Sequence, residues 1–245
     1  SIMRGVQTHP ELELQVVVGG SLMLEKYGRI LESAIVDQFD IDHEINFVIE
    51  GENPATMAKS AGLAVTEFAN AFINLKPDVV IVTADRYECL SIAMAAAYMN
   101  IPVVHLEGGE VSGSIDEMIR HAVTKMANLH LPCMPGAAQR IERMGENPEN
   151  IKVVGSTSFD VLADLDLENL EPIRTHQIKS GVGEITPINP GEYLIVIQHP
   201  VTTEYNDNLA HIQETSKAVD ELKMPTFWIW PNLDAGSDGI SKGIR

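Results

Sequence analysis

The stretch PDVVIVTADRYECLSIAMAAAYMNIPVVHLEGG, residues 77–109, decides the fold of this chain. It contains an apolar run at residues 78–83, a helical segment rich in small residues at 88–99 and a second apolar run at 102–106. Short apolar runs of this kind are typical of buried parallel strands, and a helix is the usual crossover between two such strands. The stretch therefore predicts a β-α-β unit.

The same alternation continues on both sides of this unit, as expected for the α/β class with a doubly wound parallel sheet. It is read from apolar periodicity and from small-residue turns such as that at Gly19 and Gly20. The further elements predicted are helices at residues 22–30, 55–75, 115–127 and 136–144 and strands at residues 12–19, 46–50, 129–131 and 151–155.

A loss of this rhythm predicts two domains. Residues 166–190 carry charges, glycines and prolines in close order without a clear period, and we interpret them as a linker. A new cycle follows, with a strand at 192–198, a helix at 207–222 and a strand at 226–230. One and a half βα units are too few for a stable domain. We therefore expect residues 1–165 to form a Rossmann-like domain that lacks its first strand, and residues 191–245 to begin a second, nucleotide-binding Rossmann-like domain that is incomplete.

Charge and composition limit the partners. The chain has 245 residues and a formal net charge of -18, which repels nucleic acid and anionic membrane surfaces. An anionic small molecule would need local arginine or histidine side chains, or a helix N-terminus. No apolar run is long enough for a membrane span, and two cysteines without metal-ligand spacing indicate a reducing, cytoplasmic compartment. The first residues carry neither an initiator Met nor a signal-peptide pattern, so we expect the chain to begin partway into a longer protein.

Ionisable side chains follow the predicted strands, where doubly wound sheets bind ligands. Asp85 and Arg86 follow the strand at 78–83, and Glu107 follows the strand at 102–106. Asp85 could instead cap a helix, and Arg86 could be a surface cation. The later strands are followed by His199, which could be structural, and by Asn232, Asp234 and Ser237, which could form an ordinary turn.

The segment HLEGGEVSGSIDEMIRH, residues 105–121, is the most informative. Two glycines precede a helix start at which Ser114 and Glu117 form a predicted capping box. Such a start is a potential phosphate site, and Arg120, one turn beyond Asp116 on the same face, is predicted to bind the phosphate there. Asp116 alone could serve only as a partner of the helix dipole. No His or Cys pair has metal-ligand spacing, and no P-loop, G-x-G-x-x-G or G-x-S-x-G motif occurs.

The motifs ADRYE, IPVVHLEGGEVSGSIDEMIRHAVTKMANLH, GSTSFD and QHPVTTE resemble the hydrolysing UDP-N-acetylglucosamine 2-epimerases. The resemblance implies two Rossmann-like domains in the GT-B arrangement, a nucleotide-sugar substrate, no cofactor and no metal, and a homodimer or homotetramer. It implies elimination of the nucleotide to a 2-acetamidoglucal and hydration to N-acetylmannosamine. The residues that match the family's functional positions are Asp85, Glu107 and Asp116 as acids and bases, and Arg86, His199, Asn232, Asp234 and Ser237 around the nucleotide.

Two departures from the family pattern bear on this resemblance. Thr83 and Ala84 stand where relatives commonly have His-Gly, and an N-terminal strand and a later Ser-rich loop are not among these residues. A protein lacking those two segments is predicted to be inactive. The open alternatives are the same chemistry on a UDP- or GDP-linked 2,4-diacetamido-2,4,6-trideoxy sugar, a GT-B glycosyltransferase, and a catalytically silent nucleotide-sugar sensor.

Overall fold

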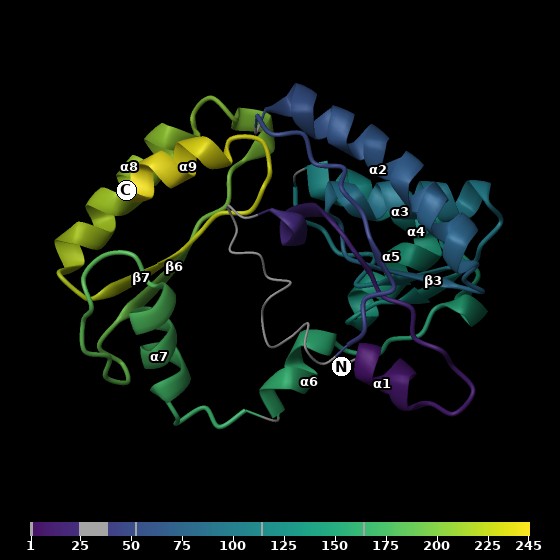
Figure 1. Ribbon diagram of the computed structural model, residues 1–245, viewed down its shortest axis with the longest axis horizontal. Helices are drawn as coiled ribbons and strands as arrows, with labels where there is room; N and C mark the ends of the chain where they lie inside the picture. The colour runs from purple at the N-terminus through teal and green to yellow at the C-terminus, as the bar shows by residue number, and fades with distance from the viewer. Residues whose placement is uncertain (1, 25–38, 52, 114, 164) are drawn as a thin grey trace. The chain divides into compact units, whose positions relative to one another are not determined.

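The computed structural model describes residues 2–24, 39–51, 53–113, 115–163 and 165–245 (Figure 1). The chain divides into two compact units, Ser1–Asp160 and Val161–Arg245. Both units are of the α/β class and all their strand pairs are parallel. No helix within the described ranges is long and apolar enough to cross a membrane.

The first unit is built around a three-stranded parallel sheet in the order β3-β4-β5. The predicted elements of this region are confirmed to within two residues. The strands are β3 (Val80–Thr83), β4 (Val103–Leu106) and β5 (Leu129–Leu131), and the helices are α2 (Pro54–Leu75), α3 (Tyr87–Tyr98), α4 (Ile115–Met126) and α5 (Pro135–Arg143). Helix α3 packs against both α2 and α4.

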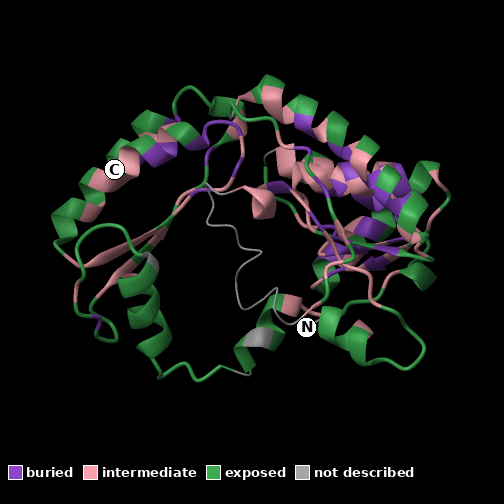
Figure 2. Ribbon diagram, in the orientation of Figure 1, coloured by how far each residue is buried: buried purple, intermediate pink, exposed green. Residues whose placement is uncertain are grey.

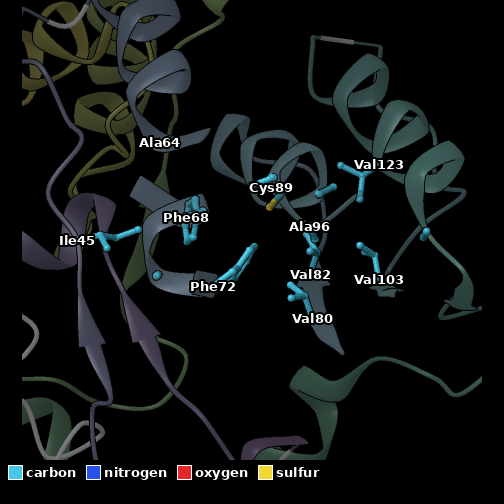
Figure 3. Packing of buried hydrophobic residues seen from close by; sticks show 14 of the residues in the cluster. Ile45, Ala64, Phe68, Phe72, Val80, Val82, Cys89, Ala96, Val103 and Val123 are labelled. Atoms are coloured by element: carbon cyan, nitrogen blue, oxygen red, sulfur yellow. The ribbon is translucent and has the colours of Figure 1, made fainter. Parts of the chain in front are cut away.

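The core of this unit lies between the sheet and these helices (Figures 2 and 3). The ring centroid of Phe68 on α2 lies 6.0 Å from that of Phe47 on the preceding segment and 6.1 Å from that of Phe72 on α2. Val82 and Val103 supply the sheet side, 1% and 0% exposed. Each large side chain buried in this way contributes about 1.5–3 kcal/mol. The core therefore fixes the β-α-β unit and, with it, the edge at which its strands end.

Three strand predictions are wrong in extent. Of residues 12–19 only Val17–Val18 form a strand, β1, which pairs with β2 (His43–Glu44). Residues 46–50 form no strand, because the Ile49 amide donates to the hydroxyl of Ser60 on α2, at 2.8 Å, instead of to a neighbouring strand. Residues 151–155 make one bridge, between Ile151 and His130. Pro132, opposite their continuation, has no amide proton to extend the ladder.

Other differences concern helices. Of the helix predicted at 22–30, Gly20–Met23 form a short 3-10 turn, η1, and residues 25–30 lie outside the described residues. The segment interpreted as a linker, 166–190, contains a helix, α7 (Glu171–Ser180). This helix is largely exposed and its sequence is polar on most sides, so it carries no apolar period. Helices α1 (Ile2–Thr8) and α6 (Thr157–Ala163) were also not predicted.

The described residues of the second unit form α7, then a β-α-β unit and a further helix. Strands β6 (Leu194–Ile197) and β7 (Thr226–Ile229) are parallel, and the helices are α8 (Asn208–Leu222) and α9 (Ser237–Ile244). The fully buried Ile212 and Ile240 lie on these two helices, which pack together. The predicted strand-helix-strand order is confirmed.

A buried series of polar contacts in the first unit joins the ends of strands β3 and β4 to helix α4. The His105 ring is 1% exposed, and its Nε2 lies 3.0 Å from the Ala84 carbonyl oxygen. Nε2 therefore carries the proton, because a carbonyl only accepts. Nδ1 lies 3.1 Å from the Thr124 hydroxyl. Burial lowers the pKa of His105 to about 4, so the ring is neutral in the folded protein.

The His105 pKa predicts a loss of stability in mild acid. The unfolded ring takes up a proton below about pH 6.5 and the folded ring does not, so falling pH favours the unfolded state. Between pH 7.5 and pH 5 this group removes about 2 kcal/mol from the free energy of unfolding. NMR titration of the folded protein is expected to show no His105 protonation above pH 5. A midpoint near pH 6.5, as in the urea-unfolded chain, would contradict the prediction.

Candidate active site

Strands β3 and β4 end side by side, and the residue after each strand has a left-handed backbone conformation. Thr83 is paired with Leu106, and the next residues, Ala84 and Glu107, have φ of 62° and 61°. The Ala84 amide donates to the Leu106 carbonyl at 3.0 Å, and the Glu107 amide to the Leu131 carbonyl at 3.1 Å. The two predicted acids, Asp85 and Glu107, thus leave neighbouring strands at the same edge of the sheet.

Asp85 is ion-paired with Arg120 of helix α4. The Arg120 side chain is 7% exposed and the Asp85 side chain 22%. Arg120 also donates to the Glu110 carbonyl at 2.8 Å and to the Ser112 hydroxyl at 3.3 Å. Burial lowers the pKa of Arg120, but a guanidinium remains charged at physiological pH. One arginine therefore joins the end of β3 to the loop that follows β4.

That loop, residues 107–113, is held closely. Gly109 has φ of 80°, and a Cβ there would overlap the Ala137 carbonyl of α5. Arg140 of α5 donates to the Gly109 carbonyl at 2.7 Å. Glu117 accepts the amides of Ser112 and Gly113 at 2.9 and 3.0 Å, and these bonds lower the pKa of its carboxyl. Ser114, the other half of the predicted capping box, lies outside the described residues.

Glu107 and Asp116 complete the carboxylate group. The Ser156 hydroxyl donates to Glu107 Oε1 at 3.4 Å. Burial raises the pKa of Cys133, and the negative charges of Glu107 and Glu110 raise it further. Asp116 is partly buried in the first turn of α4, one turn before Arg120. The structure thus has Asp85 and Glu107 directly after β3 and β4, and Asp116 in the first turn of α4, the helix that follows β4.

Arg86 begins helix α3 and differs from Arg120 in its surroundings. Its side chain is 41% exposed, and it contacts Glu88 at 3.2 and 3.0 Å through Nε and Nη2. It is therefore accessible to solvent and lies directly beside Asp85 in the sequence.

The predicted binding residues of the second unit also lie together, at the carboxyl ends of β6 and β7. The Asn232 amide donates to His199 Nδ1 at 3.2 Å, and the Asn232 side chain donates to Asp234. Ser237 is the first residue of α9 and is 1% exposed, and its hydroxyl has no hydrogen-bond partner among the described residues. Four polar residues and a helix start thus form one cluster.

Sequence reasoning missed three contributors to the first-unit site: Thr124, Arg140 and Ser156. Thr124 and Arg140 bond to atoms far from them in sequence, and no local pattern signals this. Ser156 lies in the motif GSTSFD, but only the fold brings it to Glu107. Among the described residues, no group of three His, Cys, Asp or Glu side chains could hold a metal ion.

The loop geometry predicts unequal effects of two glycine substitutions. Gly109→Ala and Gly113→Ala both place a side chain at positive φ, which costs about 1 kcal/mol. A Cβ at Gly113 meets nothing within 4 Å, whereas one at Gly109 also lies 2.8 Å from Ile141 Cγ1. We expect a stability loss of about 2–4 kcal/mol for Gly109→Ala and about 1 kcal/mol for Gly113→Ala, measured by urea unfolding. Equal losses would contradict the packing around Gly109.

Comparison with known proteins shows which family the chain resembles. The family model described as UDP-N-acetylglucosamine 2-epimerase matches residues 4–245. A UDP-N-acetylglucosamine 2-epimerase of Neisseria meningitidis serogroup B is 31% identical over 235 residues, 96% of this chain and 59% of the relative. A UDP-N,N'-diacetylbacillosamine 2-epimerase (hydrolyzing) of Legionella pneumophila is 30% identical over 249 residues, 100% of this chain and 63% of the relative.

Solved structures agree on the fold. A Methanocaldococcus jannaschii UDP-GlcNAc 2-epimerase in complex with UDP-GlcNAc and UDP has a TM-score of 0.75 at 16% identity, covering 99% of this chain and 64% of that one. The Neisseria meningitidis enzyme bound to UDP-GlcNAc has a TM-score of 0.73 at 16% identity, covering 98% and 64%. The predicted GT-B fold is thereby confirmed. The chain spans about 60% of these relatives, so its second domain is incomplete beside theirs. The chain belongs to the UDP-N-acetylglucosamine 2-epimerase family.

Proposed function

We propose that the protein containing this chain is a hydrolysing 2-epimerase that converts UDP-N-acetylglucosamine to N-acetylmannosamine and UDP. The observation that carries the proposal is that Asp85 and Glu107 follow the paired ends of β3 and β4, with Asp116 in the first turn of the next helix, α4. Membership of the family supports epimerisation of a nucleotide sugar. Relatives named as hydrolyzing, at 30% and 28% identity, support the hydrolysing type.

The chemistry needs several acids and bases around one sugar ring. A base removes the C2 proton as the C1–O bond breaks, which releases UDP and leaves a 2-acetamidoglucal. Water then adds across the double bond, with its oxygen at C1 and a proton delivered to the opposite face of C2. Three carboxyl groups held at one sheet edge suit this sequence of proton transfers. Neither base nor acid is assigned to an individual residue.

The residues proposed to bind the nucleotide are Arg86 in the first unit and, considered separately, the cluster of His199, Asn232, Asp234 and Ser237 in the second unit. Arg86 is an accessible cation, and Ser237 opens a helix whose N-terminus favours a phosphate. A homodimer or homotetramer and a cytoplasmic location stay predictions.

An alternative substrate is equally consistent with the relatives. The Legionella enzyme and a Campylobacter jejuni enzyme, 28% identical over 237 residues, are named for diacetylbacillosamine sugars linked to UDP or to GDP and UDP. Such a sugar undergoes the same elimination and hydration. A GT-B glycosyltransferase is the other candidate, favoured only by the fold, and it would need an acceptor.

Removal of single carboxylates is expected to abolish most turnover. Asp85→Asn, Glu107→Gln and Asp116→Asn keep side-chain size but lose a proton-transfer group, so each is expected to lower kcat on the order of 10²-fold or more. Glu142→Gln, an exposed acid on α5, is the matched control and is expected to keep full activity. Full turnover by Glu107→Gln would contradict a proton-transfer role for this residue, and nucleotide-sugar binding without turnover by the unaltered protein would favour the sensor.

The product distinguishes the reaction types. We expect incubation of the full-length protein with UDP-N-acetylglucosamine in D₂O to give free N-acetylmannosamine carrying deuterium at C2, together with UDP, observed by proton NMR. A manno-configured product still attached to UDP would overturn the hydrolysing assignment. Turnover of only the diacetamido nucleotide sugars would move the assignment to that substrate, and an absolute need for an acceptor would favour the glycosyltransferase.

A further inference from the structure

Arg120 is enclosed by the protein's own acceptors. Its Nη2 contacts the Asp85 carboxylate and the Ser112 hydroxyl, and its Nη1 donates to the Glu110 carbonyl. Because the side chain is only 7% exposed, a bound phosphate could reach these donors only by displacing those contacts. The phosphate-binding role that the sequence favoured for Arg120 does not fit this arrangement.

Arg120 and Asp85 also belong to a closed ring of contacts that includes Ala84, His105 and Thr124. The Thr124 hydroxyl lies 3.0 Å from the Arg120 carbonyl oxygen and 3.1 Å from His105 Nδ1, two acceptors that share its single proton. His105 in turn donates to the carbonyl of Ala84, the residue before Asp85. The guanidinium thus fixes the Asp85 carboxylate, while His105 fixes the backbone that carries it.

The same guanidinium holds the following loop at Glu110 and Ser112, and Arg140 holds it at Gly109. Glu107 begins this loop, so its position relative to Asp85 depends on those contacts. A fixed spacing between two acids is what a pair of proton transfers on one sugar ring requires.

We propose that Arg120 is a positioning residue, which holds Asp85 and the 107–113 loop in their reactive arrangement and does not bind the substrate's phosphates. This inference rests on the proposed function for its kinetic consequences. The anchoring of the 107–113 loop by Arg120 does not depend on which substrate the protein uses.

The test compares Arg120→Met with Arg86→Met and Arg143→Met in the full-length protein. We expect Arg120→Met to lower kcat on the order of 10²-fold, with KM and the Kd for UDP changed less than about threefold. Arg86→Met is expected to weaken UDP binding about tenfold or more. Arg143→Met, an exposed cation on α5, is the matched control and is expected to change neither quantity. A weakened UDP affinity with unchanged kcat in Arg120→Met would overturn the proposal.

Hydrogen exchange supplies a readout that does not need turnover. In Arg120→Met, the amides of residues 107–113 are expected to exchange at least tenfold faster, while those of α2 keep their protection. Unchanged exchange in the loop would overturn the proposal even if the protein acts on another substrate. If Arg120→Met fails to fold, Ser112→Ala and Arg120→Lys replace it: both are expected to show the same faster loop exchange, and unchanged exchange in both would overturn it.

Discussion

The register of β3 against β4 is the constraint on which the candidate site depends. Because Thr83 lies opposite Leu106, the residues that follow, Ala84 and Glu107, leave the sheet at the same level and both adopt left-handed backbone. Non-glycine residues in this region cost about 1–2 kcal/mol each. Hydrogen bonds of the Ala84 amide and carbonyl and of the Glu107 amide offset that cost. A shift of the register by one residue would separate the two acids and turn their side chains to different faces.

The buried polar groups follow from the same geometry. A left-handed residue after β3 turns its carbonyl towards His105, and a neutral imidazole donates to it. Thr124 and Arg120 then lie one turn apart on α4, which extends the chain of contacts to Asp85. Removing one member of such a network leaves the other polar groups buried without a hydrogen-bond partner, which is unfavourable. Each contact of the ring therefore depends on the others.

The parts of the fold that the sequence predicted well are those set by local periodicity. Helix α2 and the β3-α3-β4 unit combine long apolar patterns with short connections, and their bounds were predicted to within two residues. The strand at 46–50 failed because a distant hydroxyl, that of Ser60, took the amide of Ile49. Helix α7 was not predicted, because its sequence is polar on most sides and has no apolar period. For the site, the rule that ligands bind at strand carboxyl ends predicted the positions of Asp85 and Glu107. The spacing of residues on a helix does not show how deeply a side chain is buried, so the sequence did not predict that Arg120 is buried.

Burial of Arg120 changes how the chain can bind an anion. With a net charge of -18, favourable charge must come from nearby groups. Arg120 faces Asp85, and Arg140 donates to a backbone carbonyl. Arg86 is left as the accessible cation among the candidate residues, and it shares its charge with Glu88. In the second unit, considered by itself, the amide hydrogens at the start of α9 and the His199 ring beside Asn232 supply fixed dipoles, which favour an anion without adding net charge.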